Sequence, residues 1–590
     1  MCGIVGYLGS KQKGSFLIDK LKRLEYRGYD SSGIANNEFG TIKIFKECGN
    51  ISNLEKVVPE DFEITCSMAQ TRWATHGVAS RDNAHPHMSH DGEWAIVHNG
   101  IIENYDRIKT CLKHKPNGET DTAVIAEFLS ETNVSDFKGF VESFQHVVGS
   151  FAIVAINKNY NDMLFVAKQK SPLYICKNKE CDVMVASDPI CFSGFGDECY
   201  ILNDGEFAQI THSCIDFRNT NFEKIQKQPE CVDVGYSMAS SQGYKHFMLK
   251  EIMEQPQSIS KQIQVFKEQN VFKKIIEKIR GKFEKVKFIG CGTAYHAGLV
   301  GARYFSKILK VQASAEIASE FIYSQPVLAD EKTLFVFISQ SGETADTLKA
   351  VDMAKQLGAT TVALTNVLYS SIARSSEFVL PVCAGPEIAV ASTKAYTCQL
   401  SALYLFANAL NDFDNLEKYY NEILNLSKNL LNFDKCKLDD VAKKLSLRND
   451  VVFIGKDIDY VTAMEASLKL KEVAYINSAS YPSGELKHGY LAIIEKHTPL
   501  IVFASQTDIN IKSINAASEA VSRGADPIFV TNDCCFRYGD FCVIELKQSN
   551  DMLSAISSIV PMQYLAYKTS VIKGLNPDQP RNLAKSVTVE

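Results

Sequence analysis

Short hydrophobic runs separated by turn residues fill the first 215 residues of the chain. Within these runs the residues are apolar throughout or alternate between apolar and polar, which is typical of β-strands. The runs are CGIVGYLG (2–9), SGIANNEFGTIKIFKE (32–47), WAIVHNGII (94–102), SFAIVAINK (150–158) and MLFVAKQ (163–169). DTAVIAEFLSET (121–132) has instead the apolar spacing of an amphipathic helix. The pattern therefore predicts an α+β domain over residues 2–215.

The pattern changes after a polar, weakly patterned stretch at residues 216–250, in which SMASSQG (237–243) is the best linker candidate. Beyond this stretch, apolar strands, small polar loops and helices alternate, as in α/β proteins whose parallel sheets are covered by helices. We predict one α/β domain over residues 275–420, a second over 440–580, and a C-terminal tail at 581–590.

The two α/β segments look like copies of one unit. VKFIGCGTAYHAG resembles VVFIGKDIDYVTA, LFVFISQSGET resembles LIVFASQTDIN, and TVALTN resembles DPIFVTN. At these three strand ends the second copy follows the first by 165 or 166 residues. Such a constant offset indicates a duplication, and ligands of doubly wound sheets bind at the carboxyl ends of the strands.

The length of 590 residues predicts three or four domains. The composition, with 45% hydrophobic and 22% charged residues, is that of a soluble globular protein. The net charge is −6 and no basic patch stands out, so we expect no nucleic-acid partner. The start lacks the basic region of a signal peptide, and the longest apolar stretch, residues 400–410, is too short for a bilayer. The 17 cysteines form no disulfide framework, which favours a cytoplasmic protein.

Four histidines close together raise the question of a metal site. His85, His87, His90 and His98 fall within fourteen residues. No cysteine or HExxH spacing accompanies them, so we read them as hydrogen-bond partners in a polar loop and predict no metal.

The most informative loop of the second half is FISQSGETADTLKA, where a buried strand ends at Ser339 and a helix follows. Glycine at position 342 permits close backbone approach, and free N–H groups at a helix N-terminus favour an anion. Hydroxyls from Ser341 and Thr344 add donors, which favours a phosphate over an ordinary helix cap. In the second copy the glycine is gone and Asp508 would repel an anion, so we expect the first copy alone to bind phosphate.

Two carboxylates and a lysine form a second candidate group. On a helix Glu465, Lys469 and Glu472 share a face, and GELKHG (484–489) follows them. The residues leave two readings open: a solvated salt-bridge stripe, or a group that shuttles protons on a phosphosugar. By pattern alone Lys585, near the end of the chain, is a solvated lysine of a frayed terminus.

Cys2 directly follows the initiator methionine. If Met1 is removed, Cys2 carries both a thiol and the free α-amine. The amine can then act as the base for its own nucleophile, because the two groups titrate close to each other.

Taken in order, these motifs resemble the glutamine–fructose-6-phosphate aminotransferase (isomerising) family over nearly the whole chain. The matching motifs are CGIVGY, YRGYDSSG, TRWATHG, AHPH, HNGIIENY, ETDTAVI, KEIMEQP, GCGT, SQSGETADT, VASTKAY, LKLKE, GELKHG and PRNLAKSVTVE. The resemblance implies an α+β N-terminal-nucleophile glutaminase domain with αββα layers, followed by two α/β sugar-isomerase (SIS) domains with parallel sheets.

In the first half the resemblance implies a glutamine site. Cys2 matches the family's nucleophile, and Asn99 with Gly100 matches its oxyanion hole. The residues that match the family's glutamine-binding loop and its ammonia gate are Arg72, Trp73, His76 and Asp121. Arg72 would grip the glutamine carboxylate, Asp121 its ammonium, and Trp73 would gate the passage of ammonia.

In the second half the resemblance implies a sugar-phosphate site. The matches to its phosphate contacts are Thr293, Ser339, Gln340, Ser341 and Thr344. Glu472 matches the base that moves a proton between C1 and C2, with Lys469 beside it, and His488 matches the histidine that assists ring opening. Lys585 matches the lysine that forms a Schiff base. The resemblance therefore replaces the interpretation of Lys585 as a solvated lysine of a frayed terminus. Ala294 departs from the family, which often carries serine there.

The implied reaction converts L-glutamine and D-fructose 6-phosphate into D-glucosamine 6-phosphate and L-glutamate, with no metal or organic cofactor, in a homodimer. Other glutaminase-type amidotransferases would need an ATP-pyrophosphatase or phosphoribosyl-diphosphate loop in the second half, and neither is present in the sequence. A non-catalytic sugar-phosphate sensor would not need Cys2, Glu472, His488 and Lys585 together.

Overall fold

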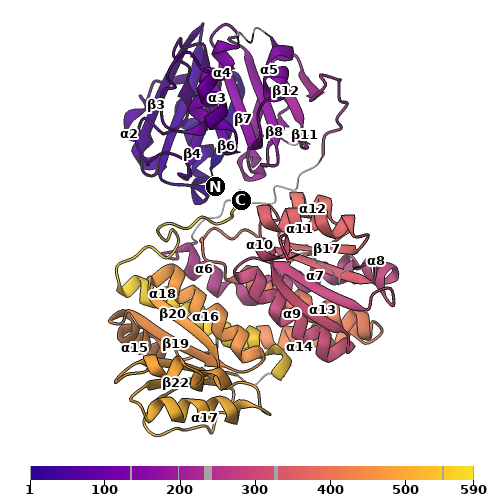
Figure 1. The fold of residues 1–590 in the computed structure, drawn as a ribbon, viewed down its shortest axis with the longest axis vertical. Helices are drawn as coiled ribbons and strands as arrows, with labels where there is room; N and C mark the ends of the chain where they lie inside the picture. The colour runs from indigo at the N-terminus through magenta and orange to yellow at the C-terminus, as the bar shows by residue number, and fades with distance from the viewer. Residues whose placement is uncertain are drawn as a thin grey trace. The chain divides into compact units, whose positions relative to one another are not determined.

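The computed structural model describes residues 2–132, 134, 136–196, 198–230, 242–324, 330–547 and 550–588. They divide into a first unit, made of residues 2–230 with 584–588, and a second unit, made of residues 242–583 (Figure 1). Most of the predicted linker SMASSQG lies outside the described residues. None of the helices in the described ranges combines the length and apolar character that crossing a membrane requires.

Two antiparallel sheets lie face to face in the first unit. Among the described residues their strand orders are β11-β9-β10-β1-β4-β2-β3 and β13-β12-β8-β7-β6-β5. Ile4 and Leu8 of β1 pack between the sheets against Val97 and Val154 of the second sheet. The strands are β1 (Gly3–Lys13), β2 (Ser31–Glu38), β3 (Thr41–Cys48), β4 (Glu63–Arg72), β5 (His87–Met88), β6 (Trp94–Ile102), β7 (Gly149–Asn157), β8 (Met163–Gln169), β9 (Tyr174–Lys177), β10 (Val183–Ala186), β11 (Glu198–Ile201), β12 (Glu206–Thr211) and β13 (Ile215–Asn219).

Helices cover the outer faces of both sheets. Because side chains alternate along a strand, Tyr7 points away from the inter-sheet core, and its ring meets Phe16 of α1 with 5.3 Å between centroids. On the other sheet, Trp94 of β6 packs against Phe140 of α5. The helices are α1 (Gly14–Lys22), α2 (Ile51–Val57), α3 (Tyr105–Cys111), α4 (Asp121–Glu131) and α5 (Phe137–Phe144), with the 3₁₀ turns η1 (Glu25–Arg27) and η2 (Pro189–Phe192). The layers run α, β, β, α, which confirms the predicted architecture.

The second unit contains two parallel sheets of identical strand order. Within the described part of the chain these orders are β15-β14-β16-β17-β18 and β20-β19-β21-β22-β23. The strands are β14 (Lys285–Gly290), β15 (Gln312–Ile317), β16 (Thr333–Ser339), β17 (Thr360–Thr365), β18 (Phe378–Pro381), β19 (Asp450–Gly455), β20 (Asn477–Pro482), β21 (Pro499–Phe503), β22 (Asp526–Thr531) and β23 (Cys542–Glu545). The predicted duplication is thereby confirmed, and we call the two sheets with their helices the first copy and the second copy.

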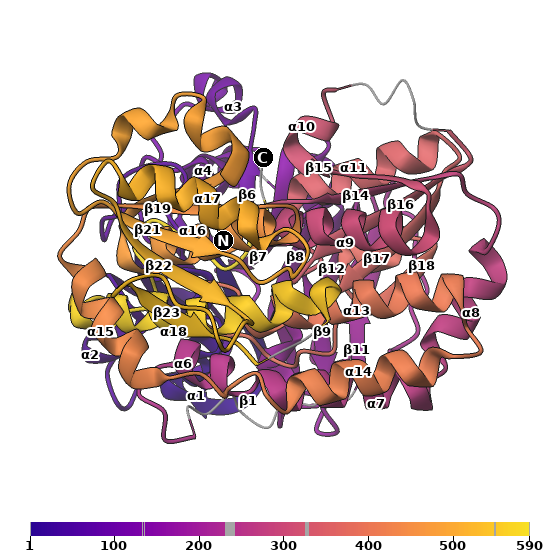
Figure 2. The same cartoon turned by 90° about the horizontal axis from the view of Figure 1, so that it is seen from below.

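Helices lie on both faces of each sheet (Figure 2). In the first copy α9 and α13 pack on one face and α11 on the other; in the second copy α16 and α18 face α17 across the sheet. The helices are α6 (Phe247–Met253), α7 (Gln255–Glu268), α8 (Val271–Ile279), α9 (Thr293–Leu309), α10 (Ala318–Phe321), α11 (Ala345–Gln356), α12 (Ser371–Ser375), α13 (Lys394–Asn411), α14 (Leu416–Ser427), α15 (Lys435–Ser446), α16 (Ile458–Ala474), α17 (Asn510–Val521) and α18 (Ser554–Ile572), with the 3₁₀ turns η3 (Ser483–Lys487), η4 (Tyr490–Ile493) and η5 (Asp551–Leu553).

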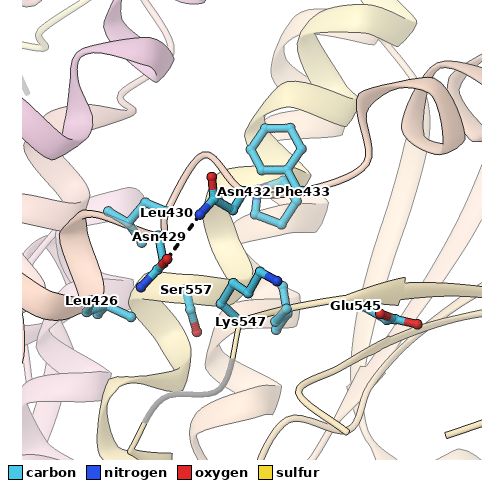
Figure 3. A pocket seen from close by; sticks show the side chains of 10 residues that line it. Leu426, Asn429, Leu430, Asn432, Phe433, Glu545, Lys547 and Ser557 are labelled. Carbon is cyan, nitrogen blue, oxygen red and sulfur yellow. Dashed lines mark hydrogen bonds between the residues drawn. The ribbon is translucent and has the colours of Figure 1, made fainter. Parts of the chain in front are cut away.

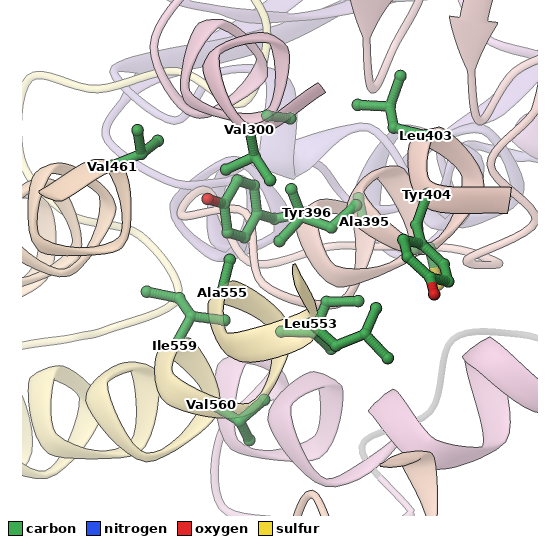
Figure 4. Close-up of a cluster of buried hydrophobic side chains, with 14 of the residues drawn as sticks. Val300, Ala395, Tyr396, Leu403, Tyr404, Val461, Leu553, Ala555, Ile559 and Val560 are labelled. Carbon is green, nitrogen blue, oxygen red and sulfur yellow. The ribbon is translucent and has the colours of Figure 1, made fainter. Parts of the chain in front are cut away.

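One hydrophobic core joins the two copies. Figure 4 shows Val300 of α9 and Tyr396 of α13 close to Val461 of α16 and Ile559 of α18, and all four side chains are buried. The core therefore holds α9 of the first copy against α16 of the second, and polar side chains on these two helices can meet.

Candidate active sites

Cys2 lies at the start of β1, beside the end of β4. Its Sγ accepts a hydrogen bond from the backbone N–H of Trp73 at 3.3 Å. Burial raises the pKa of the Cys2 thiol, and the Trp73 N–H and the positive charge of Arg72 act against that rise. The strand pairing places the thiol next to the TRWATHG segment, where three of the four predicted glutamine-site residues lie.

Asn99 and Gly100, near the end of β6, also lie close to Cys2. The Asn99 Nδ2 amide donates to the Cys2 carbonyl oxygen at 2.9 Å, and its Oδ1 accepts from Gln70 Nε2 at 3.2 Å. Gly100 has φ +135°, and a Cβ atom there would lie 1.9 Å from the carbonyl oxygen of Ser150. Only glycine fits at this position, and of the two residues of the predicted oxyanion hole Asn99 contacts the predicted nucleophile, Cys2.

Arg72 ends β4 with its side chain almost wholly buried. One guanidinium nitrogen donates to the carbonyls of His76 and Gly77, while the other, Nη1, is buried and has no hydrogen-bond partner among the described residues. Unused buried donors are costly, and a guanidinium fork binds a carboxylate in a bidentate manner. The site can therefore hold the carboxylate of an amino acid.

Asp121 is a buried carboxylate that contacts the end of β6. It is the first residue of α4, where its Oδ2 accepts the N–H of Ile102 at 2.9 Å and its Oδ1 accepts that of Thr122 at 2.9 Å. Trp73 and His76 are placed by edge-on ring contacts, Trp73 with Tyr29 at 5.7 Å and His76 with Tyr105 at 5.3 Å.

Three of the four clustered histidines are buried hydrogen-bond partners. His87 uses both ring nitrogens, one with the carbonyl of Asn117 at 3.0 Å and one with the Thr120 hydroxyl at 2.9 Å. Burial lowers the pKa of His87 to about 3 and lowers that of His85 as well. His90 is exposed and lies apart from this group.

The loop at residues 339–344, which we call the phosphate loop, connects β16 to α11. Ser339 Oγ accepts the N–H of Gly342 at 3.0 Å and lies 2.9 Å from the hydroxyl of Thr344, while Ser341 Oγ accepts the N–H of Glu343 at 3.2 Å. Gly342 has φ +66°, and a Cβ atom there would lie 1.9 Å from Ser370 Oγ. The hydroxyls therefore gather around a tight turn at the N-terminus of a helix.

A buried ionic network links α9 to α16. Lys469 Nζ lies 2.6 Å from Glu472 Oε2 and 3.4 Å from Glu465 Oε1, and it donates to the Thr293 hydroxyl at 3.0 Å. Glu465 Oε1 accepts from the same hydroxyl at 3.0 Å, and its Oε2 lies 2.7 Å from His296 Nδ1. Burial by itself would lower the pKa of Lys469, but the two glutamates raise it above the usual value. Burial by itself would raise the pKa of Glu465, but Lys469 and His296 lower it below the usual value.

This network decides between the two readings of the helix face. Lys469 and Glu465 are wholly buried, so the face is no solvated salt-bridge stripe. The structure brings Thr293, Lys469 and Glu472 together, at the N-terminal end of α9 and along α16. In the sheet of the first copy, β14 and β16 are adjacent parallel strands. β14 ends just before Thr293, and β16 ends at Ser339.

Two predicted residues are not part of this network. His488 is exposed and directly follows η3. Lys585 is half-buried in the C-terminal tail and belongs to the first unit, whereas Glu472 belongs to the second. The roles of His488 and Lys585 therefore rest on the resemblance alone.

Known proteins match both units. A family model described as a glutamine amidotransferase domain matches residues 70–193, and one described as an SIS domain matches residues 281–409 and 444–573. The glutamine–fructose-6-phosphate aminotransferases (isomerising) of Clostridium acetobutylicum and Shouchella clausii are 39% and 38% identical to the chain, over 100% of each chain. The chain belongs to the glutamine–fructose-6-phosphate aminotransferase (isomerising) family.

A solved structure of the same family supports the assignment of the second unit. The C-terminal domain of glucosamine-fructose-6-phosphate aminotransferase from Francisella tularensis superposes with a TM-score of 0.54 and 34% identity, covering 58% of this chain and 100% of that chain. The fold predicted from the sequence, a glutaminase domain followed by two SIS domains, is confirmed.

The sequence patterns did not identify His296, and they placed Glu465 only on a helix face shared with Lys469 and Glu472. His296 lies one turn into α9 and is separated from Glu465 by 169 residues, so no local pattern joins them. The usable signal was the histidine in GTAYHAG, which follows Thr293 by three residues and therefore shares its helix face.

One small pocket lies away from the predicted site residues. Figure 3 shows it between Leu426, Leu430 and Phe433 on one side and Ser557 on the other, with Asn432 Nδ2 donating to Asn429 Oδ1 at 3.0 Å. Its lining mixes apolar and amide side chains with Glu545, Lys547 and Ser557, and we assign it no role.

Proposed function

We propose that the chain catalyses the glutamine-dependent amination and isomerisation of D-fructose 6-phosphate, which yields D-glucosamine 6-phosphate and L-glutamate. This is the first step of hexosamine biosynthesis. The observation that carries the proposal is the combination, in one chain, of a buried Arg72 fork next to the Cys2 thiol and a hydroxyl-rich loop next to the Glu465–Lys469–Glu472 network. Full-length similarity to curated enzymes of that name supports it.

In the first unit, the Cys2 thiol, as the N-terminal residue after loss of Met1, attacks the carboxamide carbon of glutamine. The Asn99 side chain and the Gly100 backbone stabilise the negative charge on the oxygen. Collapse of this intermediate releases ammonia and leaves a thioester, and water then releases glutamate. Arg72 and Asp121 hold the carboxylate and the ammonium of the glutamine.

The phosphate loop of the second unit holds the sugar phosphate, and Lys585 of the C-terminal tail, in the role that the resemblance assigns to it, forms an imine at the C2 ketone. Ammonia passed internally displaces the lysine. Glu472 takes a proton from C1 and returns it to C2, which gives the aldose. Lys469, which is wholly buried, holds the Glu472 carboxylate in place through an ion pair with 2.6 Å between Nζ and Oε2. The homodimer and the role of His488 in ring opening stay predictions.

The test is a two-substrate assay with glutamine labelled with ¹⁵N at the amide. In excess unlabelled ammonium, the wild-type product should carry ¹⁵N. Cys2→Ala should abolish glutamine use while leaving fructose 6-phosphate binding. Lys585→Arg should retain glutaminase activity but make no glucosamine 6-phosphate.

Three outcomes would contradict the proposal. One is an active enzyme that retains Met1 by mass spectrometry. Another is unlabelled product from the wild type, which would exclude internal transfer of ammonia. The third is a borohydride-reduced adduct with fructose 6-phosphate that maps to Lys469 or Lys487 instead of Lys585.

A further inference from the structure

Glu127 of α4 is a buried carboxylate whose ionic partner is a histidine. Its side chain is wholly buried. Oε2 accepts the backbone N–H of His90 at 2.9 Å, and Oε1 is in contact with His90 Nδ1. No lysine or arginine forms an ion pair with it among the residues that the structure describes. Buried carboxylates are normally paired with a cation or bound to a metal, and among the described residues an imidazole is the partner that Glu127 has.

A second imidazole lies against the first. The rings of His90 and His114 stack with 3.7 Å between centroids and 14° between planes. One ligand atom from each of His90, His114 and Glu127 lies within 4.8 Å of the other two. Two histidines and one glutamate form a known donor set for Zn²⁺ with an open fourth position.

His114 is also held as metal-binding histidines usually are. Its Nδ1 lies 3.1 Å from Glu131 Oε1, and the same carboxylate accepts the backbone N–H groups of Lys113 at 2.8 Å and His114 at 2.7 Å. A histidine that donates Nδ1–H to a fixed carboxylate presents Nε2 for coordination, and this arrangement recurs around protein-bound zinc.

We propose that His90, His114 and Glu127 bind one divalent transition-metal ion of the zinc class. The ion replaces the proton between His90 Nδ1 and Glu127, and that proton moves to Nε2 of the same ring. The exposed rings of His90 and His114 rotate out of their stacked arrangement, so that one nitrogen lone pair of each ring points to the ion. Water takes the fourth coordination position. The ion places a permanent positive charge next to the buried Glu127 carboxylate. It also ties the β5–β6 turn and the α3–α4 segment to α4, so it is a stabilising site separate from the glutamine site.

The test uses untagged, EDTA-treated chain with Co²⁺ as the probe, because tetrahedral Co²⁺ absorbs visible light. The parent protein carries Cys534→Ser and Cys535→Ser, since Asp533 and these two exposed cysteines form another group of close ligand atoms. We expect one Co²⁺ per chain, displaced by Zn²⁺, and a rise in Tm on binding. His90→Ala and His114→Ala should abolish the absorption, and Glu131→Gln should weaken Co²⁺ binding about 10-fold.

The matched control is His497→Ala. Like His114, His497 is exposed and paired with a carboxylate, Asp526, at 3.1 Å, and its removal should leave Co²⁺ binding unchanged. Since Glu127 is buried, the exposed histidines carry the test, with circular dichroism to check folding. The proposal is wrong if the parent protein binds no Co²⁺, if His90→Ala and His114→Ala bind it as the parent does, or if His497→Ala abolishes the signal.

Discussion

The phosphate loop of the first copy and the loop at residues 505–510 of the second copy occupy equivalent places in two sheets of the same strand order. In the first copy the loop hydroxyls contact the loop itself, with Ser339 Oγ accepting the N–H of Gly342 at 3.0 Å. The carboxylate of Glu343 is turned to the N-terminus of α12, where Oε1 accepts the N–H of Ser371 at 2.9 Å.

In the second copy, two carboxylates of the chain occupy the loop. Asp459 accepts the backbone N–H of Ser505 at 2.8 Å and also the Ser505 hydroxyl. Asp551 accepts the N–H and the hydroxyl of Thr507 at 2.8 and 3.0 Å. Donors of the kind that would bind an anion are therefore already satisfied from within the chain.

The position equivalent to Asp459 in the first copy is Ala294, because the copies are offset by 165 residues at this strand end. Ala294 has no carboxylate that could accept from the loop of the first copy. This difference between Ala294 and Asp459, in the first turns of α9 and α16, agrees with the proposal that only the first loop binds phosphate.

The largest effect should come from putting a carboxylate into the first loop. Ser341→Asp places a negative charge next to a bound phosphate, which costs on the order of 4 kcal/mol at 4 Å near a protein surface. We expect the Kd for fructose 6-phosphate to rise by at least roughly 100-fold, as measured by calorimetry.

Thr507→Asp is the matched control, because Thr507 is the equivalent residue in the second copy. It should leave fructose 6-phosphate binding unchanged and lower the Tm, since the new carboxylate would face Asp551. Unchanged affinity in Ser341→Asp, or equal loss in Thr507→Asp, would move the phosphate site to the second copy.

The buried carboxylate of the second copy should leave a signature in the pH dependence of stability. Burial raises the pKa of Asp459 to about 6, although the hydrogen bonds from Ser505 oppose the rise. The unfolded value is about 3.9, so the folded chain keeps a proton that the unfolded chain releases between about pH 4 and pH 6. This contribution to stability, up to about 3 kcal/mol, is complete below pH 4 and is lost as the pH rises through 6.

Asp459→Asn removes this titration. The Tm of the wild type relative to Asp459→Asn should therefore fall as the pH rises from 4 to 7. Asp450→Asn, which changes an exposed carboxylate at the start of β19, should keep the wild-type dependence. Parallel curves for the wild type and Asp459→Asn would show that Asp459 stays ionised in the folded chain.

Substitution of His296, in the first copy, should slow the proton transfer that we propose for Glu472 in the second copy. His296 holds Glu465, which pairs with Lys469 next to Glu472. A hydrogen bond to a charged group contributes about 1.5–3 kcal/mol, so His296→Ala should lower kcat for glucosamine 6-phosphate synthesis about 10- to 100-fold. KM for fructose 6-phosphate and glutaminase activity should change little.

His296→Asn keeps a donor near the position of Nδ1 and should recover most of the lost kcat. A KM effect as large as the kcat effect, or no recovery in His296→Asn, would mean that His296 has only a packing role.

Much of this comparison could be predicted from the sequence, because it depends on local patterns. The alternating runs predict the strands, the constant offset predicts the duplication, and SQSGET predicts a turn at a helix N-terminus. The occupant of the second loop could not be predicted in this way. The sequence pointed to Asp508, which is exposed, whereas Asp459 and Asp551 reach the loop from 46 and 44 residues away. Contacts of this kind depend on packing between elements and leave no local periodicity.

The smallest effect should come from one hydroxyl of the phosphate loop. Thr344 lies 2.9 Å from Ser339 Oγ at the start of α11, and Thr344→Val removes the hydroxyl while keeping the shape of the side chain. The loss of one neutral hydrogen bond costs about 1 kcal/mol, so the Kd for fructose 6-phosphate should rise about fivefold with little change in Tm. Thr507→Val in the second copy removes the hydroxyl that Asp551 accepts, so it should lower the Tm and leave the Kd unchanged. If Thr344→Val instead lowered the Tm and left the Kd unchanged, the Thr344 hydroxyl would stabilise the fold, as the Thr507 hydroxyl does in the second copy through Asp551, and would take no part in phosphate binding.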